Sequence, residues 1–248
     1  MNQLEIRNLF KQFGTNEVLD DISFTIDDGE FVSILGPSGS GKSTLFQIIG
    51  GIMLPSAGSI HLNGKDITGK NGHISYTPQS ASLLPWRTVL GNVMLGQEIS
   101  GKADVEEAKK MVERAGLAGF EDAYPHELSG GMKQRVSFIR SVMSPQSLIL
   151  LDEPFSALDE FTRLDMQKWL LSIWSEHKKS ILFITHNIEE ALFLSDRIIV
   201  FSERPTSIKA EFTVPFSRPR KEELLLTDEF FQWKRKIYGR LVGEAWKK

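Results

Sequence analysis

A glycine-rich loop stands between a short apolar run and a helix-forming segment. Residues 36–43, Gly-Pro-Ser-Gly-Ser-Gly-Lys-Ser, satisfy the pattern G-x-x-x-x-G-K-[ST]. The run from Phe31 to Leu35 is too short for a helix and is typical of a strand buried on both faces. From Ser43 to Ile52 the pattern is helical, and the stretch from Leu54 to Gly58 breaks it. A strand, loop and helix in this order predict an α/β fold with a binding site for phosphate groups.

The composition of this loop has a chemical reason. Its glycines let backbone N–H groups curl around phosphate oxygens, and the N-terminus of the following helix adds partial positive charge. We expect Lys42 to reach the β- and γ-phosphates of a nucleotide and Ser43 to offer its hydroxyl to Mg²⁺. The residues expected to contact the nucleotide here are Gly36, Pro37, Ser38, Gly39, Ser40, Gly41, Lys42, Ser43 and Thr44.

Two carboxylates follow a second apolar run. Ser147 to Leu151 is a predicted buried strand, and Asp152 and Glu153 stand directly after it. The carboxyl ends of the strands in an open α/β sheet face the ligand crevice. We therefore expect Asp152 to help hold Mg²⁺ and Glu153 to polarise the attacking water. An exposed acidic turn before Pro154 would explain the turn, but not its occurrence in the same chain as the glycine-rich loop.

A second pair of glycines opens another helix. Residues 128–135 are Leu-Ser-Gly-Gly-Met-Lys-Gln-Arg, in which Ser129 is a natural N-cap. The Ser129 hydroxyl, the N–H groups of Gly130 and Gly131 and the helix dipole form a second possible anion site. Taken alone, this pattern is more often mere helix capping.

The remaining segments alternate strands and helices, which predicts a parallel sheet covered on both sides. Half-buried antiparallel strands are expected around Leu4 to Ile6 and Ile22 to Ile26, and short strands around Ser59 to Leu62 and His73 to Tyr76. Helices are expected from Ala103 to Gly116, with Val105 among the inward residues, and from Thr162 to His177, and a further buried strand from Ser180 to Thr185. A terminal helix is expected from Thr227 on, with one apolar face formed by Phe230, Trp233, Ile237, Leu241 and Ala245.

Composition excludes several classes. The 248 residues contain no cysteine, which excludes disulfides and thiolate metal sites, and no apolar run approaches the ~18 residues of a membrane span. A net charge of −3 gives no general reason to bind nucleic acid. Without a basic and then apolar leader, a cytosolic protein is the expectation.

The order of these motifs resembles that of the ATP-binding-cassette (ABC) ATPases. The similarity extends to about residue 205 and includes Leu148-Ile149-Leu150-Leu151-Asp152-Glu153-Pro154 and Ser156-Ala157-Leu158-Asp159. It implies a P-loop NTPase core with a mostly parallel sheet, an antiparallel β subdomain and a helical subdomain. The implied ATPase domain is residues 1–205, with a catalytic core of 1–83 and 141–205 and a helical subdomain of about 84–140, followed by a tail of 206–248 that ends in a helix.

The resemblance also implies roles for further residues. Gln79 corresponds to the glutamine that contacts Mg²⁺ and water, His186 to the histidine that contacts the γ-phosphate, and Phe13 to the aromatic that stacks on adenine. In the family, two ATPs are held between two copies of the cassette. Each lies between one chain's P-loop and the other's Ser129-Gly130-Gly131, and Asp159 helps to join the sites. A homodimer in the ATP-bound state is therefore expected.

Other segments resemble importer ATPases of the nitrate/sulfonate/taurine group. They are Tyr124-Pro125-His126-Glu127, the segment from Ser82 to Val93, Phe155 to Asp159, and Arg204-Pro205. The resemblance implies a peripheral subunit on the cytoplasmic face of the cell membrane, which energises uptake of a sulfonate, nitrate, taurine or pyrimidine precursor. The apolar residues of Leu83 to Trp86 would receive membrane permease subunits, and a substrate-binding protein would act indirectly.

Alternatives remain at this stage. Leu83, Leu84 and Trp86 taken in isolation are more often ordinary core. A soluble ABC ATPase outside transport is the rival class. A DNA-repair protein would need a long coiled-coil insertion between the P-loop and the signature, and residues 43–128 are too few to contain one. A cluster-assembly ATPase is harder to exclude. A regulator that binds nucleotide without hydrolysis is disfavoured because Lys42, Asp152, Glu153 and His186 are all present.

Overall fold

A computed structural model describes residues 2–156 and 158–242, and these form two compact units. The first contains the described residues up to His73 and those from Ser180 on, and the second runs from Ile74 to Lys179. These two units reflect which parts of the chain pack together, not which parts share a function, so the functional boundaries at 83, 140 and 205 stay predictions. None of the helices in the described residues has the length and apolarity that a membrane crossing needs.

The first unit has an antiparallel sheet in the order β2-β1-β4-β5. Its strands are β1 (Asn2–Phe13), β2 (Asn16–Asp27), β4 (Ala57–Leu62) and β5 (Lys65–Asp66). The predicted alternation is confirmed, because Leu4 pairs with Ile26 and Ile6 with Phe24, and all four side chains are buried.

Parallel strands form the second layer of this unit. They are β3 (Phe31–Leu35), β8 (Ser180–Thr185) and β9 (Arg197–Phe201), with β10 (Ile208–Thr213) antiparallel to β9. β3 pairs in parallel with β8 and β9, and all residues of β3 and β8 are buried. Strands covered on both faces have near-continuous apolar sequences, and this explains why the two runs were recognisable from sequence.

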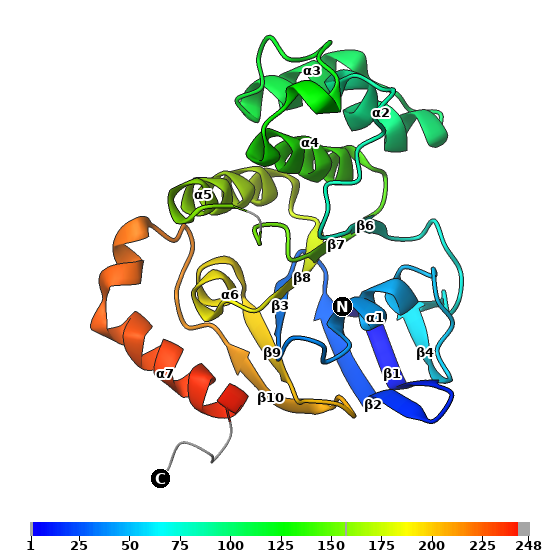
Figure 1. Ribbon diagram of the computed structural model, residues 1–248, viewed down its shortest axis with the longest axis vertical. Helices are drawn as coiled ribbons and strands as arrows, with labels where there is room; N and C mark the ends of the chain where they lie inside the picture. The colour runs from blue at the N-terminus through cyan, green and yellow to red at the C-terminus, as the bar shows by residue number, and fades with distance from the viewer. Residues whose placement is uncertain (1, 157, 243–248) are drawn as a thin grey trace. The chain divides into compact units, whose positions relative to one another are not determined.

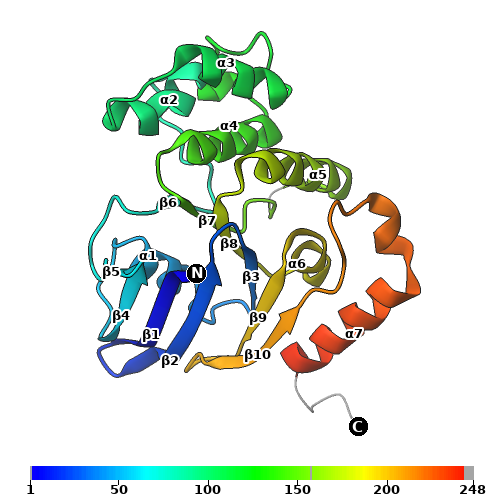
Figure 2. The same ribbon diagram turned by 180° about the vertical axis from the view of Figure 1, so that it is seen from behind.

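Three helices cover these strands: α1 (Lys42–Ile49), α6 (Ile188–Leu194) and α7 (Asp228–Val242), with a short 3₁₀ helix η2 (Glu222–Leu226) before α7. α6 packs on β3 and β8, and α7 runs beside α6 and β9 (Figures 1 and 2). The predicted terminal helix is confirmed to Val242, and Ala245 lies outside the described residues. The predicted end of the first helix at Ile52 is wrong, because Gly51 adopts φ +74° and α1 stops at Ile49.

The second unit pairs two short parallel strands with four helices. β6 (Ser75–Thr77) pairs with β7 (Leu148–Asp152). The helices are α2 (Val89–Ile99), α3 (Val105–Arg114), α4 (Gly130–Met143) and α5 (Glu160–His177), with a 3₁₀ helix η1 (Pro125–Glu127) before α4. The sequence did not predict α2, because Gly91, Asn92, Gly96 and Gln97 interrupt its apolar pattern.

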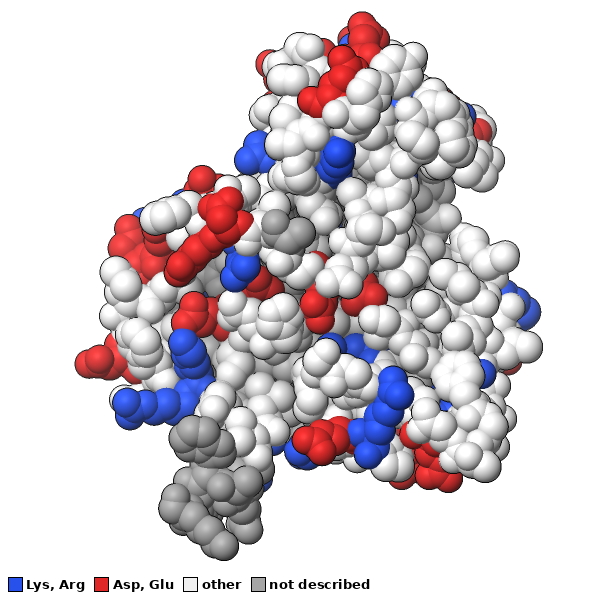
Figure 3. Space-filling view, viewed as in Figure 1, with Lys and Arg blue, Asp and Glu red and all other residues white. Residues whose placement is uncertain are grey.

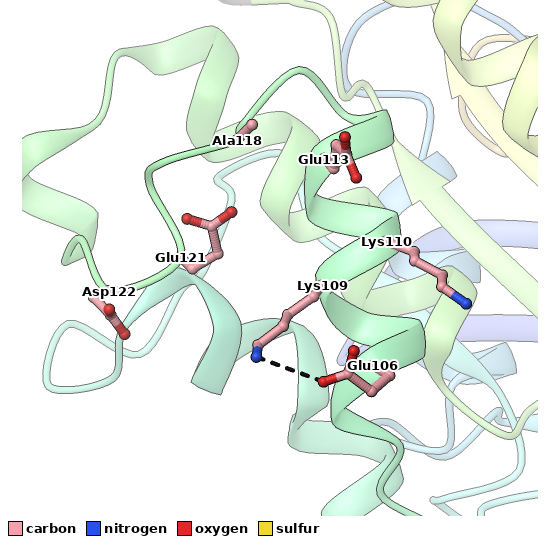
Figure 4. Close-up of a pocket in the computed structure, with 7 residues that line it drawn as sticks. All are labelled: Glu106, Lys109, Lys110, Glu113, Ala118, Glu121 and Asp122. Atoms are coloured by element: carbon pink, nitrogen blue, oxygen red, sulfur yellow. Dashed lines mark ion pairs between the residues drawn. The ribbon is translucent and has the colours of Figure 1, made fainter.

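Helix α3 is amphipathic. Ala108, Met111 and Val112 are buried, whereas Val105, predicted to face inward, is 43% exposed because it is the first helical residue. Charged side chains of the outer face line a shallow depression with the loop that follows the helix (Figure 4). One ion pair there joins Lys109 Nζ to Glu106 Oε1 at 3.6 Å. Such exposed pairs contribute little to stability.

Charges of both signs are interspersed over the face that Figure 3 presents. This distribution agrees with the small net charge of −3.

Candidate nucleotide-binding site

The phosphate loop, residues 36–43, joins β3 to α1 in the first unit. Gly41 has φ +96°, and a Cβ there would lie 2.7 Å from Cγ1 of Val18, so only glycine fits. The Thr206 hydroxyl donates to the carbonyl of Ser40, and the Thr206 N–H donates to the carbonyl of Val18 at 3.1 Å. Contacts with Val18 and Thr206 therefore fix the shape of the loop.

Lys42 lies inside this loop. Its side chain is 5% exposed, and Nζ donates to the carbonyls of Gly36 at 2.9 Å and Pro37 at 2.8 Å. No side chain caps the N-terminus of α1, and its first turn contains no acidic residue. An ammonium group, glycine backbone and uncapped helix start fit a polyphosphate, because all three present hydrogen-bond donors or positive charge. Ser43 is exposed and Thr44 half-buried.

His186 follows β8 and is exposed. It lines one cavity of about 650 Å³ together with Asn187 and the first residues of the phosphate loop, Gly36, Pro37 and Ser38. Asn187 caps α6, since its Oδ1 accepts from the N–H of Glu189 at 2.8 Å. The structure thus brings the predicted γ-phosphate histidine and the phosphate loop to the same cavity.

Phe13 is the last residue of β1 and is 46% exposed. The Nζ atom of Lys11 lies 4.7 Å from the centroid of its ring. An exposed aromatic ring beside a cation offers a face for stacking, whereas a core phenylalanine would not.

The predicted catalytic carboxylates lie at the end of β7 in the second unit. Asp152 is 5% exposed, and the hydroxyl of Tyr76 donates to its Oδ2 at 3.4 Å. Burial, followed by the charge of Asp152, raises the pKa of Tyr76, so the phenol stays protonated. Glu153 adopts a left-handed φ of +45°, which is uncommon for a residue with a side chain. Outliers of this kind are concentrated at functional sites.

Gln79 lies beside this turn. Its Nε2 donates to Oγ of Ser156 at 3.2 Å, and that hydroxyl donates to the carbonyl of Glu153 at 3.0 Å. Gln134 of α4 donates to the carbonyl of Gln79 at 3.3 Å. Within the second unit the structure therefore groups Gln79, Asp152 and Glu153. Sequence patterns did not reveal Ser156 and Gln134 as links, because their partners are distant in the chain.

The signature loop, residues 128–131, begins α4. The predicted cap is confirmed, because Oγ of Ser129 accepts from the N–H of Met132 at 3.3 Å. Gly130 is exposed, and a Cβ there would have no neighbour within 4 Å. A Cβ on Gly131 would lie 3.5 Å from Cγ2 of Thr162, so this loop is adjacent to the start of α5.

Asp159 caps α5. Its Oδ1 accepts from the N–H of Thr162 at 3.1 Å, and hydrogen bonding from Thr162 lowers the pKa of the Asp159 carboxyl. Of the segment Ser156 to Asp159, Ala157 lies outside the described residues.

The segment from Leu83 to Trp86 is only partly buried and is held by hydrogen bonds to α2. The amide of Asn92, fully buried in α2, accepts from the N–H of Leu84 at 2.8 Å and donates to the Leu84, Arg87 and Thr88 carbonyls. Leu83 and Leu84 are half-buried, but Trp86 is 71% exposed, which excludes ordinary core for that residue. Asn92 was not predicted from sequence as such a link, although an asparagine among apolar residues such as Val89 and Val93 indicates a buried amide that needs hydrogen-bond partners.

Similarity to known proteins agrees with this geometry. Residues 19–156 match the model of the ABC transporter family. The formylaminopyrimidine import ATP-binding protein ThiZ of Halalkalibacterium halodurans is 44% identical over 86% of this chain and 85% of its own. The aliphatic sulfonates import ATP-binding protein SsuB of Bacillus anthracis is 41% identical over 90% and 87%.

Solved structures agree as well. A dimeric post-hydrolysis state of an ATP-binding cassette, bound to ADP and phosphate, superposes with a TM-score of 0.72 at 28% identity over 86% of this chain and 100% of that one. The predicted ABC ATPase fold is thereby confirmed. With the family match over more than half its length, this chain belongs to the ABC transporter family, as an ATP-binding subunit that hydrolyses ATP.

Proposed function

We propose that this chain energises an importer of a small solute of the sulfonate, nitrate, taurine or pyrimidine-precursor type. It acts at the cytoplasmic face of the cell membrane, docked through the region Leu83–Trp86 on integral permease subunits, while a substrate-binding protein acts indirectly. The observation that carries this proposal is the 41–44% identity to import ATP-binding proteins over nearly nine-tenths of the chain. The exposed Trp86 side chain, on a segment that Asn92 holds by hydrogen bonds, supports the docking role, since aromatic anchors that become buried dominate many interfaces.

The residues of the first unit bind the nucleotide. Lys42 and the N–H groups of the phosphate loop bind the phosphates, Phe13 stacks on adenine, and His186 holds the γ-phosphate. Ser43 of the first unit, and Gln79 and Asp152 of the second, would provide the protein oxygens for Mg²⁺, which would supply charge neutralisation at the phosphates. Among the described residues no three His, Cys, Asp or Glu side chains form a metal cluster. The hydroxyl, amide and carboxylate oxygens of Ser43, Gln79 and Asp152 suit Mg²⁺, which takes few protein oxygens besides those of substrate phosphates.

Glu153 orients and polarises the attacking water, and its carboxylate accepts a proton as the water oxygen bonds to the γ-phosphorus. The bond from that phosphorus to the bridging oxygen breaks in the same displacement, and ADP leaves. Gln79 contacts the same water through its side-chain amide, whose Nε2 also donates to Oγ of Ser156. Because the Ser156 hydroxyl also donates to the Glu153 carbonyl, a shift of Gln79 would move the turn that carries Glu153.

We propose further that two copies of the chain complete each site. The hydroxyl of Ser129 accepts from Met132, so its hydrogen can donate to a phosphate oxygen, and the exposed Gly130 gives a partner's nucleotide room to approach. Asp159, adjacent to this loop through the start of α5, joins the two sites.

A pull-down tests the transport assignment. Tagged chain isolated from solubilised native membranes should bring a permease with it, and Trp86→Ala should lose the permease while keeping its ATPase activity. Phe231→Ala, which removes a 47% exposed aromatic of α7, is the control. Recovery of a ribosome or a cluster-assembly scaffold in place of a permease would overturn the importer function and leave the ATPase intact.

A further inference from the structure

Helix α6, which directly follows the turn of His186, is held at its C-terminal end by a buried arginine. Nη1 of Arg220 donates to the carbonyls of Leu192 and Phe193 at 3.1 Å and of Ser195 at 2.7 Å. The side chain is 8% exposed, and burial lowers its pKa to about 10, so it remains a cation at neutral pH. The last carbonyls of a helix lack intrahelical partners, and a cation there is favourable.

A second arginine strengthens this end. Nε of Arg218 donates to Oδ1 of Asp196 at 2.7 Å, and its Nη2 donates to the carbonyl of Leu194. α6 has seven residues, too few to be stable without tertiary contacts. Besides its packing on β3 and β8, α6 is therefore held by the segment after β10, residues 214–242, which we call the C-terminal clamp.

The clamp also holds the other end of α6. Nζ of Lys234 on α7 pairs with Oε1 of Glu189, in the first turn of α6, at 2.5 Å. Phe230, Lys234 and Ile237 share one face of α7, and Phe230 and Ile237 are buried in a cluster with Ala191. One helix thus contributes both apolar packing and an ion pair to α6.

The same face of α7 reaches the nucleotide side of the unit. Lys234, Tyr238 and Leu241 line the cavity that His186 and Gly36 also line. The turn of His186 is tied to α6 by hydrogen bonds, because Asn187 caps the helix and the Thr185 hydroxyl donates to Glu190 at 2.5 Å. These hydrogen bonds couple the position of α6 to the two residues that flank His186.

We propose that the C-terminal clamp positions His186 for ATP hydrolysis, with Arg220 and Lys234 as positioning residues at the two ends of α6. The proposal rests on the role given above to His186. Neither residue touches the nucleotide in this scheme. Both act through the placement of the imidazole, so their loss lowers kcat while binding of ATP by the phosphate loop persists.

The test is steady-state kinetics of full-length Lys234→Met, with Arg235→Met as the matched control on the same helix. We expect kcat to fall about tenfold in Lys234→Met, because small misplacements of catalytic groups cost large factors. The dissociation constant for ATP, the melting temperature and the control should stay unchanged. Glu189→Lys should lower kcat in the same way, and Glu189→Lys combined with Lys234→Glu should restore it.

Arg220→Met and Arg220→Lys test the other end. We expect Arg220→Met to lose more kcat than Lys234→Met, and Arg220→Lys to recover part of it; if Arg220→Met does not fold, the Lys234 series decides alone. Lys234→Met with kcat within about twofold of wild type would overturn the proposal. So would a loss of kcat that is matched by weaker ATP binding, or that the reversed pair does not restore.

His186→Ala separates this inference from the proposed function. If His186→Ala keeps full turnover, the role assigned to His186 fails and the clamp has nothing to position. If His186→Ala abolishes turnover while Lys234→Met does not change it, only the clamp is refuted.

Discussion

The phosphate loop and the signature loop both place glycines at the start of a helix, but they are completed differently. In the phosphate loop, Lys42 is 5% exposed and donates to the loop's own carbonyls, and Gly41 has no room for a side chain. In the signature loop, Gly130 is exposed, and a methyl group added there would meet no other part of the chain within 4 Å beyond the adjacent helix backbone. One loop is organised by its own chain, whereas the other offers an open surface. This difference is what a site completed by a second copy requires.

The largest effect is expected for Glu153→Gln, which leaves both loops intact and removes only the carboxylate that we propose as the base. Turnover should fall about thousandfold, a typical contribution of a general base. A stable dimer should then accumulate with ATP, measured by light scattering with and without nucleotide. Wild-type turnover would reassign the base, and a variant that stays monomeric at saturating ATP would argue against a shared site.

Ser129→Arg should have the next largest effect. A long cation in the open loop blocks the partner's nucleotide, so turnover should fall about a hundredfold, as for loss of a key phosphate donor. ATP binding by the monomer, measured by fluorescence of a labelled nucleotide, should not change. Ser172→Arg adds the same side chain on an exposed position of α5 and serves as control. Survival of activity that is linear in enzyme concentration would contradict the two-chain site.

A pair of alanine substitutions compares the loops directly. Gly41→Ala should destabilise the fold by about 1–3 kcal/mol, because it combines a left-handed φ with a contact to Val18. Gly130→Ala should leave stability within about 1 kcal/mol, or raise it, since alanine suits a helix and the space is empty. Its turnover should nevertheless fall. Chemical denaturation and ATPase assays of both variants check this; equal destabilisation would remove the contrast between the loops.

The smallest effect concerns Asp159 and pH. The hydrogen bond from Thr162 lowers the pKa of the folded-state carboxyl below its ordinary value of 3.8. The stabilisation is therefore fully present above that ordinary value and is lost as the pH falls through the lowered one. Asp159→Ala should melt slightly earlier than wild type at pH 7, and the difference should shrink as the pH falls below about 4. A difference that grows in acid would contradict the capping role.

Sequence patterns predicted the elements whose signals are local. Phe31 to Leu35, the glycine loop and the cap at Ser129 each depend on neighbouring residues, and all are confirmed. Helix α2 was missed because polar residues and glycines interrupt its apolar pattern, and the bonds by which its buried Asn92 holds the preceding segment are not visible in such a pattern.

Long-range contacts were likewise beyond the sequence. Arg220 bonds one nearby carbonyl, that of Phe216, but its three bonds to the end of α6 reach carbonyls 25 to 28 residues earlier, which no local pattern indicates. The exposure of Trp86 was also undetermined, because residue type alone favours the core. The grouping of Gln79 with Glu153 through Ser156 is visible only in the folded structure, although Gln79 and Glu153 had each been predicted as site residues.

Disulfide trapping tests the shared site most directly, because the natural chain has no cysteine. In the Glu153→Gln background, one preparation carries Ser38→Cys in the phosphate loop and another carries Ser129→Cys in the signature loop, both at exposed positions. Mixing the two under mild oxidant should give a covalent dimer with ATP and little without it, while neither preparation alone should do so. Failure to cross-link at saturating ATP, or cross-linking at the same yield without nucleotide, would contradict the account.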